Sequence, residues 1–348
     1  MDELMRVMTP RPRNAETPRP YLRSWITANK VFFDRNQGEI PETEIDLSTW
    51  RLTISGEVET PFSADFEYLL SMPKAIVANT LECSGNSRSL LDKKASGNPW
   101  TIGGVGNAVW GGVWLKDLLE KVVVSSNASH VAFEGFDKPL GKAQIKFIRS
   151  IPLSKALSST LLAYEMNGEP LPLKHGHPLR ALALGWTGAN CVKWLEKITL
   201  LEKPYEGFYM DQVYRIHQPD QDPKTGEHVT DIEIKSIITQ PEPEAELQTG
   251  RVTILGAAYA GEADIDKVEI STLQRQSLFD SSMLGQSNAG TAAARLRAIN
   301  PDCEVVAVSS RLEGESLSGA VAQVDLVIDC SDNFDTRFAV NRACVQQQ

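Results

Sequence analysis

The pattern of apolar residues changes abruptly near residue 272, and this change divides the chain between two unlike architectures. Before it, short alternating strands mix with short helices, and no strand–helix–strand repeat predicts a parallel sheet. After it, helical patterns span 271–279 and 289–302. Apolar runs at 303–310 and 324–333 are typical of buried strands in an α/β sheet. The 348 residues therefore predict an α+β part followed by a smaller α/β part.

Short elements follow one another before residue 272. Alternation predicts a strand in 50–58, and helical spacing follows over 61–72 with Ser63 as the cap. Residues 75–88 indicate a strand that runs into a tight polar turn. The other expected elements are a helix in 112–124, a strand in 129–137, a helix then a strand in 153–168, a strand-like edge in 192–203, and three strands in 230–239, 251–260 and 266–271.

Composition indicates the boundaries between the parts of the chain before residue 272. Residues 1–20 are polar and rich in proline, which predicts an irregular N-terminal arm. The turn-rich segment 217–229 indicates a linker. The three strands after it, alternating and separated by glycine, suggest the start of a β-sandwich.

Charge and cysteine content exclude several classes of protein. The net charge of -10 argues against a nucleic-acid or membrane-surface partner, because either would need a basic face. No apolar run is long enough to span a bilayer, and the N-terminus shows no secretory pattern, so the sequence predicts a cytoplasmic protein. Five cysteines with no zinc-like spacing indicate neither a disulfide framework nor a zinc site.

Cys83 is the first residue that points to chemistry. It ends a predicted strand in TLECSGNSR, where small residues leave its thiol approachable. Arg88, five residues later, favours the thiolate, which is the soft ligand that a redox metal takes. A small buried core cysteine is the alternative interpretation of this window alone.

Cationic and proton-donating side chains recur on predicted loops of this acidic chain. Arg35 follows two aromatics in FFDRN, and Lys193 precedes Trp194 in GANCVKW. Each has an ordinary alternative, such as a surface arginine stacked on a ring or a turn. Together they suit a large polyanionic cofactor and a small oxyanion substrate. The others in this set are His175, His177, Arg180, Tyr214 and Arg215.

Seven segments resemble, in order, the sulfite-oxidase-type molybdopterin domain. The resemblance covers roughly residues 20–220 and continues weakly to 271. It implies a molybdopterin-binding catalytic domain at 21–228 and a truncated Ig-like dimerisation sandwich at 229–271. The segments are FFDRN, TLECSGNSR, NPWTIGGVGNAVWGGVWLKDLL, VAFEGFD, RSIPLSKAL, LLAYEMNGEPLPLKHGHPLR and GWTGANCVKW.

The resemblance also implies roles for individual residues. Cys83 is implied as the equatorial thiolate ligand of molybdenum. The implied holders of the pyranopterin and its phosphate are Phe33, Asp137, Ser150, His175, Arg180 and Lys193, with backbone amides near 189–191. The implied oxyanion pocket is Arg35, Arg88, Trp100 and Tyr214.

The resemblance implies oxidation of sulfite to sulfate by oxygen-atom transfer at molybdenum, with an external cytochrome or oxygen as electron acceptor and no haem in this chain. Some positions depart from the family pattern. Gln37 stands where animal enzymes have histidine, and Asn190 where an arginine is common. Two alternatives stay open: a sulfoxide-type reductase on the same domain, which the arginine set disfavours, and a non-catalytic chimera.

The last segment resembles a different family, the adenylating enzymes of the ThiF/MoeB type. LQRQSLF, LGQSNAGTAAARLRAINP and DLVIDCSDNFDTRFAVNRAC carry this resemblance over about 266–348, with a partial α/β fragment at 272–348. Arg275 and Asp332 are implied contacts of ATP and magnesium. The glycine-rich phosphate loop is not present, so the sequence predicts no autonomous adenylation.

The junction between the two resemblances lies in IDKVEIS, a string common to both families. A recombination or assembly artefact and a functional fusion are both consistent with it. A shortened sandwich joined to half an α/β sheet leaves strand edges uncovered. The sequence therefore predicts that the homodimer expected of the family is weakened or lost here.

Overall fold

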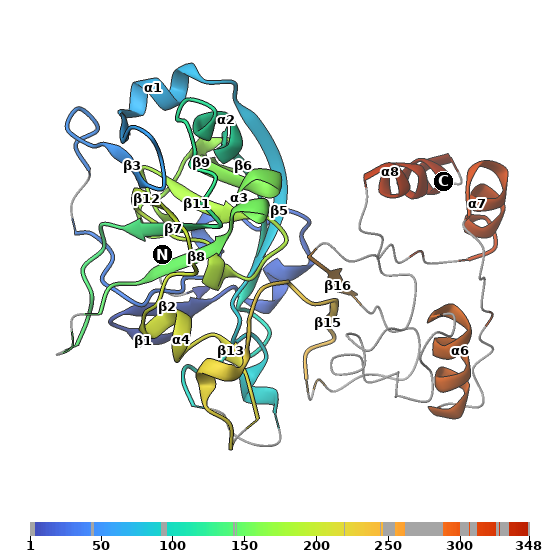
Figure 1. Ribbon diagram of the computed structural model, residues 1–348. Coiled ribbons are helices and arrows are strands. Elements are labelled where there is room, and N and C mark those ends of the chain that lie inside the picture. Colours follow the sequence, from blue (N-terminus) through green and yellow to red (C-terminus); the bar gives the residue numbers. More distant parts are fainter. Residues whose placement is uncertain are drawn as a thin grey trace. The chain divides into compact units, whose positions relative to one another are not determined.

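A computed structural model describes residues 4–42, 45–91, 96–141, 143, 145–218, 220–243, 245, 255–261, 288–299, 306, 312–324, 327 and 334–346. The chain divides into two compact units, Met1–Ile232 and Glu233–Gln348. In Figure 1 the first unit contains most of the strands, and its colours run from blue to yellow. Within the described residues, no helix is both long and apolar enough to cross a membrane.

In the first sheet of unit 1, one strand ends at the residue before Cys83. Its order is β10-β9-β6-β5, and β11 also pairs with β9. Every pairing in it is antiparallel. The bounds are β5 Ala75–Glu82, β6 Val105–Trp114, β9 Thr160–Met166, β10 Glu169–Pro170 and β11 Arg180–Ala183.

The second sheet has the order β4-β3-β12-β7-β8. The strand in 192–203, expected at an edge, lies in the middle of this sheet as β12. It pairs parallel with β3 and antiparallel with β7, so the sheet contains one parallel pair that no sequence repeat predicted. The bounds are β3 Leu52–Gly56, β4 Phe62–Ala64, β7 His130–Gly135, β8 Ile148–Pro152 and β12 Leu195–Leu201.

Short helices pack on this unit, and Figure 1 shows α1 and α2 at its upper end with α3 below them. The predicted helix in 61–72 exists as α1, but its cap is Asp65, whose carboxylate accepts the backbone N–H of Tyr68 at 2.8 Å. The predicted cap, Ser63, lies on β4 because that stretch pairs with β3. The bounds are α1 Phe66–Ser71, α2 Leu115–Leu119, α3 Leu153–Ser159 and α4 Phe208–Asp211.

Two apolar clusters hold unit 1 together. The larger one takes fully buried side chains from both sheets and from α2, including Ile54, Leu118 and Leu162. Burying each such side chain stabilises the fold by roughly 1.5–3 kcal/mol. The smaller cluster contains Phe32, Phe33, Leu81, Cys83, Trp100, Trp110 and Cys191, among others.

The predicted irregular arm is wrong, because residues 6–16 form a β-hairpin. Strands β1 Arg6–Pro10 and β2 Arg13–Glu16 pair antiparallel, and residues 14–17 are buried. Ala15 and Asp34 exchange two backbone hydrogen bonds of 2.9 Å, which attach the hairpin to the FFDRN segment. A polar sequence gives no sign of this burial, because the partners of its polar groups are distant in the chain.

A second hairpin replaces much of the predicted linker. Strands β13 Arg215–Ile216 and β14 Glu227–His228 pair antiparallel, and the 3-10 turn Pro223–Thr225 lies between them. Arg215 donates to the carbonyls of Met210 and Gly226 at 2.7 Å each. The segment is therefore an ordered part of unit 1.

Unit 2 contains a strand pair and three helices among its described residues. Two of the three predicted strands are confirmed as the antiparallel pair β15 Lys235–Gln240 and β16 Leu255–Tyr259. The third, in 266–271, lies outside the described residues, as does the helix predicted in 271–279. The predicted strands 303–310 and 324–333 also lie largely outside them. The helices are α6 Asn288–Ile299, α7 Gly314–Val321 and α8 Phe334–Gln346.

Helix α6 confirms the helix predicted in 289–302. Helices α7 and α8 pack on each other through Leu317, Val321 and Ala343.

Candidate functional site

A cavity opens to solvent where several elements of unit 1 end. Its wall comes from the loop that carries Arg35, the residues after β5 and β7, and the connection between β11 and β12. The lining residues are Phe32, Phe33, Arg35, Asn36, Gln37, Leu81, Cys83, Ser84, Asp137, Phe147, His175, Arg180, Gly188, Ala189, Cys191, Val192, Lys193, Trp194 and Tyr214.

Cys83 reaches this cavity from the end of β5 with 7% of its surface exposed. Its sulfur accepts the backbone N–H of Gly85 at 3.4 Å. Burial raises the pKa of the thiol, while Arg35, that N–H and Arg88 act in the opposite direction. The positive groups around the sulfur therefore favour the thiolate once a cation is present to offset burial.

Glycine at position 85 leaves room for this arrangement. A Cβ there would lie 2.9 Å from Nη2 of Arg88 and 3.2 Å from the Trp100 ring. Gly85 therefore lets both side chains approach the turn that follows Cys83. Neither Arg88 nor Trp100 lines the cavity itself.

Cys191 is a second thiol in the same cavity wall, and its surroundings favour the protonated thiol. Its sulfur donates to the carbonyls of Ala183 and Thr187 at 3.9 and 4.0 Å. A thiolate has no proton for such contacts, whereas a thiol does. Burial also raises the pKa of Cys191. Cys83 is therefore the better metal ligand of the two.

Buried cations form another part of the wall. Arg180 donates to the His175 carbonyl at 2.9 Å and lies 5.1 Å over the Trp110 ring, while its Nε is buried without a hydrogen-bond partner. Burial lowers the pKa of Lys193 to about 7 and that of Arg180 to about 10. Burial also lowers the pKa of His175 well below its ordinary value. Such desolvated donors are stabilised when an anion enters.

Asp137 is the acidic residue of this wall, and burial raises its pKa to about 6. Gly38 packs closely against it, because a Cβ on Gly38 would lie 2.4 Å from Oδ2 of Asp137. A carboxyl group with a pKa of about 6 can donate a hydrogen bond in its protonated form.

Tyr214 and Arg35 meet on the same wall. The Tyr214 hydroxyl accepts from Nε2 of Gln37 at 2.6 Å and lies 3.5 Å from Nη2 of Arg35. The backbone of Tyr214 is left-handed, with φ of 58°. Non-glycine residues seldom adopt this conformation, and its cost is typical of functional sites. The arrangement presents a guanidinium and a phenol side by side.

The wall fits the molybdenum cofactor that the sequence implied. It offers the Cys83 sulfur as a soft donor, the desolvated Arg180 and Lys193, and an unpartnered buried Nε on Arg180 that can contact an anion. Among the described residues, no group of three or more histidine, cysteine or acidic side chains could hold a metal ion. A metal that also has ligands from an organic cofactor suits this donor set better than one held by the protein alone.

The structure brings most of the predicted site residues together. Ser150 does not line the cavity, and its hydroxyl instead accepts the backbone N–H of Tyr205 at 2.9 Å. Arg88 and Trp100 pack against the turn at Gly85 that follows Cys83, outside the cavity lining. The predicted residues that line the cavity are Phe33, Arg35, Cys83, Asp137, His175, Arg180, Lys193 and Tyr214.

Sequence reasoning missed three supporting residues. Asn36 lines the cavity and accepts from Nζ of Lys193. Phe147 packs edge-on against Tyr214, with ring centroids 6.2 Å apart. Arg149 is 1% exposed, and its guanidinium lies 5.3 Å from the Tyr214 ring centroid. Phe147 and Arg149 are two residues apart at the start of β8, but no pattern in the sequence places them beside Tyr214 or relates them to Asn36.

Comparison with known proteins identifies the family. Residues 37–209 match the family described as oxidoreductase molybdopterin binding domain. The chain is 35% identical to the sulfite oxidase of Arabidopsis thaliana over 286 residues, which cover 77% of this chain and 72% of that protein. The chain belongs to the sulfite oxidase family of molybdopterin oxidoreductases.

Other relatives show the breadth of this sulfite oxidase family. The mitochondrial sulfite oxidase of Mus musculus is 36% identical over 74% of this chain, which spans 49% of the mouse protein. A nitrate reductase of Hordeum vulgare is 30% identical over 77% of this chain. Among solved structures, the sulfane dehydrogenase SoxCD of Paracoccus pantotrophus superposes on this chain with a TM-score of 0.64 at 28% sequence identity. The superposition covers 74% of this chain and 65% of the SoxCD chain.

The C-terminal segment matches a second family. Residues 254–348 match the ThiF family, and the match begins ahead of residue 266, where the resemblance was first placed. Strand β16 therefore falls within the ThiF segment.

The low pKa of Lys193 predicts a pH-dependent anion affinity. Lys193 has a pKa of about 7 in the cofactor-free fold, so it gains its charge as the pH falls through 7. Sulfate, which does not titrate in this range, should therefore bind the cofactor-free protein more tightly at pH 6 than at pH 8. A gained charge-assisted contact makes this change about tenfold. Calorimetry in two buffers should show proton uptake. Lys193→Met should reduce the pH dependence to the part that Asp137 contributes, because the pKa of that carboxyl is about 6. Equal affinity at both pH values would contradict the assignment.

Proposed function

We propose that this protein oxidises sulfite to sulfate. The observation that carries the proposal is one cavity that holds the Cys83 thiol, the Arg35 guanidinium and the Tyr214 hydroxyl together. The relatives named sulfite oxidase support the same substrate.

The cofactor would be held by groups already in the wall. Cys83 would ligate the metal, and Arg180, Lys193 and His175 would contact the anionic part of the pterin. Phe33, which stacks on Phe32 with ring centroids 5.3 Å apart, would give that region an apolar wall. When bound, the molybdenum cofactor supplies the two-electron redox change and the oxygen atom that sulfite gains.

The residues of the chain would bind and orient the substrate. Arg35 would neutralise the anion, with a charge-assisted contact worth roughly 1.5–3 kcal/mol. Tyr214 would donate a hydrogen bond from its hydroxyl group to a substrate oxygen, because that hydroxyl already accepts a hydrogen bond from Gln37 and its own hydrogen is still available. The apolar rings Phe32, Phe33 and Phe147 would limit water around these contacts.

A sulfoxide-type reductase is the second candidate on the same domain. A neutral sulfoxide gains little from a guanidinium, whereas sulfite gains a full charge pair. The desolvated cations of the wall therefore favour the anionic substrate.

The test is a sulfite-oxidation assay with ferricyanide as electron acceptor, run beside a molybdenum assay on protein expressed in a cofactor-competent host. Molybdenum near one per chain with sulfite-dependent ferricyanide reduction is expected. A molybdenum-loaded protein that reduces sulfoxides and ignores sulfite would favour the second candidate. A protein that takes up no molybdenum would indicate a non-catalytic chimera.

Replacing Tyr214 by phenylalanine removes one hydroxyl and leaves the ring. Phe147 and Arg149 pack against that ring and should still hold it. We expect kcat/KM for sulfite to fall about tenfold to a hundredfold, because one hydrogen bond to a charged group contributes roughly 1.5–3 kcal/mol. Steady-state kinetics at a fixed molybdenum content measure the change. Tyr205→Phe serves as the control, since Tyr205 does not line the cavity. An unchanged kcat/KM would show that the Tyr214 hydroxyl does not contact the substrate.

We also propose a domain organisation for this chain. We place the catalytic domain at 21–228 and a truncated β-sandwich at 229–271. Of the pair β15–β16, strand β15 precedes the segment that matches the ThiF family and strand β16 lies within it. An external cytochrome or oxygen would take the electrons.

A further inference from the structure

Arg35 is held entirely by neutral oxygen atoms. Its Nη1 donates to Oδ1 of Asn14 at 3.1 Å and to the Asn36 carbonyl, and its Nη2 lies 3.5 Å from the Tyr214 hydroxyl. In the part of the chain that the structure describes, no carboxylate forms an ion pair with it. The guanidinium is therefore fixed in place and keeps its charge for an anion in the cavity.

Asn14 is built into the N-terminal hairpin so that its oxygen faces Arg35. Its side chain is 1% exposed, and its Nδ2 donates to Oγ1 of Thr9 at 2.7 Å and to the Pro12 carbonyl at 2.9 Å. Its Oδ1 also accepts the backbone N–H of Asn36 at 3.0 Å. Because both acceptors lie on the nitrogen side, the amide has one satisfied orientation.

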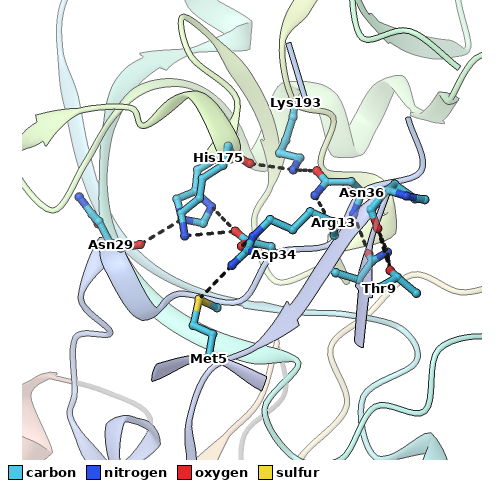
Figure 2. A network of polar contacts seen from close by, with 11 residues as sticks. Met5, Thr9, Arg13, Asn29, Asp34, Asn36, His175 and Lys193 are labelled. Atoms are coloured by element: carbon cyan, nitrogen blue, oxygen red, sulfur yellow. Dashed lines mark hydrogen bonds and ion pairs between the residues drawn. The ribbon is translucent and has the colours of Figure 1, made fainter. Parts of the chain in front are cut away.

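The hairpin also neutralises the carboxylate nearest to Arg35 in sequence. Asp34 is fully buried, and its Oδ2 accepts from Nε of Arg13 at 2.8 Å. Its other oxygen lies 3.4 Å from Nζ of Lys174 and 3.9 Å from Nδ1 of His175. Figure 2 shows Arg13 reaching Asp34 from one side and His175 from the other. Asp34 is thus paired away from Arg35.

The same hairpin touches the cofactor side of the wall. Asn36 donates from Nδ2 to the Arg13 carbonyl and accepts from Lys193, as Figure 2 shows. Asn14, Arg13 and Arg35 all precede residue 37, where the family match begins. None of the hairpin residues lines the cavity.

We propose that the N-terminal hairpin β1–β2 sets the position and the net charge of the anion pocket, with Asn14 as the positioning residue of Arg35 and Arg13 as the counter-charge of Asp34. This inference rests on the proposed function for its substrate, sulfite. An asparagine holds the guanidinium without neutralising it, and an aspartate in its place would hold it and cancel its charge. The hairpin is therefore a specificity element for anions.

The test is Asn14→Asp, which changes one nitrogen to an oxygen and keeps the acceptor that Arg35 uses. The KM for sulfite should rise about tenfold or more, because the guanidinium is neutralised by its own support. The kcat at saturating sulfite should stay within about threefold, since bound substrate is still oriented. KM does not depend on how many molecules carry the cofactor, so partial loading does not disturb this readout.

Arg13→Gln provides a second variant in case Asn14→Asp fails to fold. It leaves Asp34 less neutralised, and we expect the KM for sulfite to rise about threefold to tenfold. Arg11→Gln is the matched control, because it removes the same charge from the same hairpin at an exposed arginine that pairs with Glu39. Its KM should stay at the wild-type value.

Sulfate binding to the cofactor-free variants, measured by calorimetry, gives a readout independent of turnover. Asn14→Asp and Arg13→Gln should weaken it, and Arg11→Gln should not. If both test variants match the control in KM and in sulfate affinity, or lose only active fraction at unchanged KM, the hairpin is merely structural and the inference is overturned. If the wild type does not oxidise sulfite but the variants weaken sulfate binding as expected, the proposed function fails and the inference stands.

Discussion

Replacing Cys83 by alanine is expected to remove molybdenum from the protein and to reduce sulfite turnover by more than about a thousandfold. Cys83 supplies the soft sulfur donor that the cavity offers in a setting of positive groups, namely the Gly85 N–H, Arg35 and Arg88. A metal bound through a thiolate loses that bond with the sulfur. Molybdenum per chain by elemental analysis and ferricyanide reduction with sulfite measure the two effects.

Cys191→Ala is the matched variant, because its thiol lines the same cavity. Its sulfur donates to two carbonyls, so we expect this variant to keep its molybdenum. The reverse pattern, with metal lost from Cys191→Ala and kept in Cys83→Ala, would overturn the assignment of the ligand. Thermal unfolding of both cofactor-free variants shows whether each still folds.

Replacing Arg35 by glutamine should lower kcat/KM for sulfite by about thirtyfold to a few thousandfold. Loss of a buried charge partner for an anion costs roughly 2–5 kcal/mol, and each 1.4 kcal/mol is tenfold. Arg35→Lys keeps the charge but not the planar guanidinium that contacts Asn14 and Tyr214. The kcat/KM of this variant should therefore lie between that of the wild type and that of Arg35→Gln. Molybdenum content should change little, because Cys83 and the Arg180 region remain.

Arg51→Gln controls for the loss of a guanidinium held by neutral oxygens. Arg51 donates to the carbonyls of Ser48 and Trp50 and does not line the cavity. We expect its kcat/KM to equal that of wild type. A kcat/KM for Arg35→Gln within about twofold of this control would place the substrate elsewhere, since a direct charge contact is worth more than that.

Local sequence was sufficient for several of the regular elements of unit 1, but not for strands such as β6, β8 and β11. The strands β3, β7 and β9 and the helices α1 and α3 follow from short-range alternation or helical spacing, and all are present. Their pairing was not predictable, because the parallel neighbours β3 and β12 are distant in sequence and no pattern relates them. The burial of the polar N-terminal residues was missed for the same reason, because Asn14 accepts hydrogen bonds from Arg35 and from the Asn36 backbone, which are distant in sequence.

The sequence by itself determined the kind of site: a cysteine at the end of a strand, arginines on loops, and segments in the order of one family. Only the tertiary structure decided which of the two cavity thiols faces hydrogen-bond donors and which faces carbonyl groups. It also placed the Ser150 hydroxyl outside the cavity, where it accepts the backbone N–H of Tyr205. It also decided that Arg35 rests on neutral oxygens while Asp34 is paired elsewhere. The physical reason is that protonation and charge depend on atoms a few ångströms away in space, and those atoms belong to segments that the sequence does not place side by side.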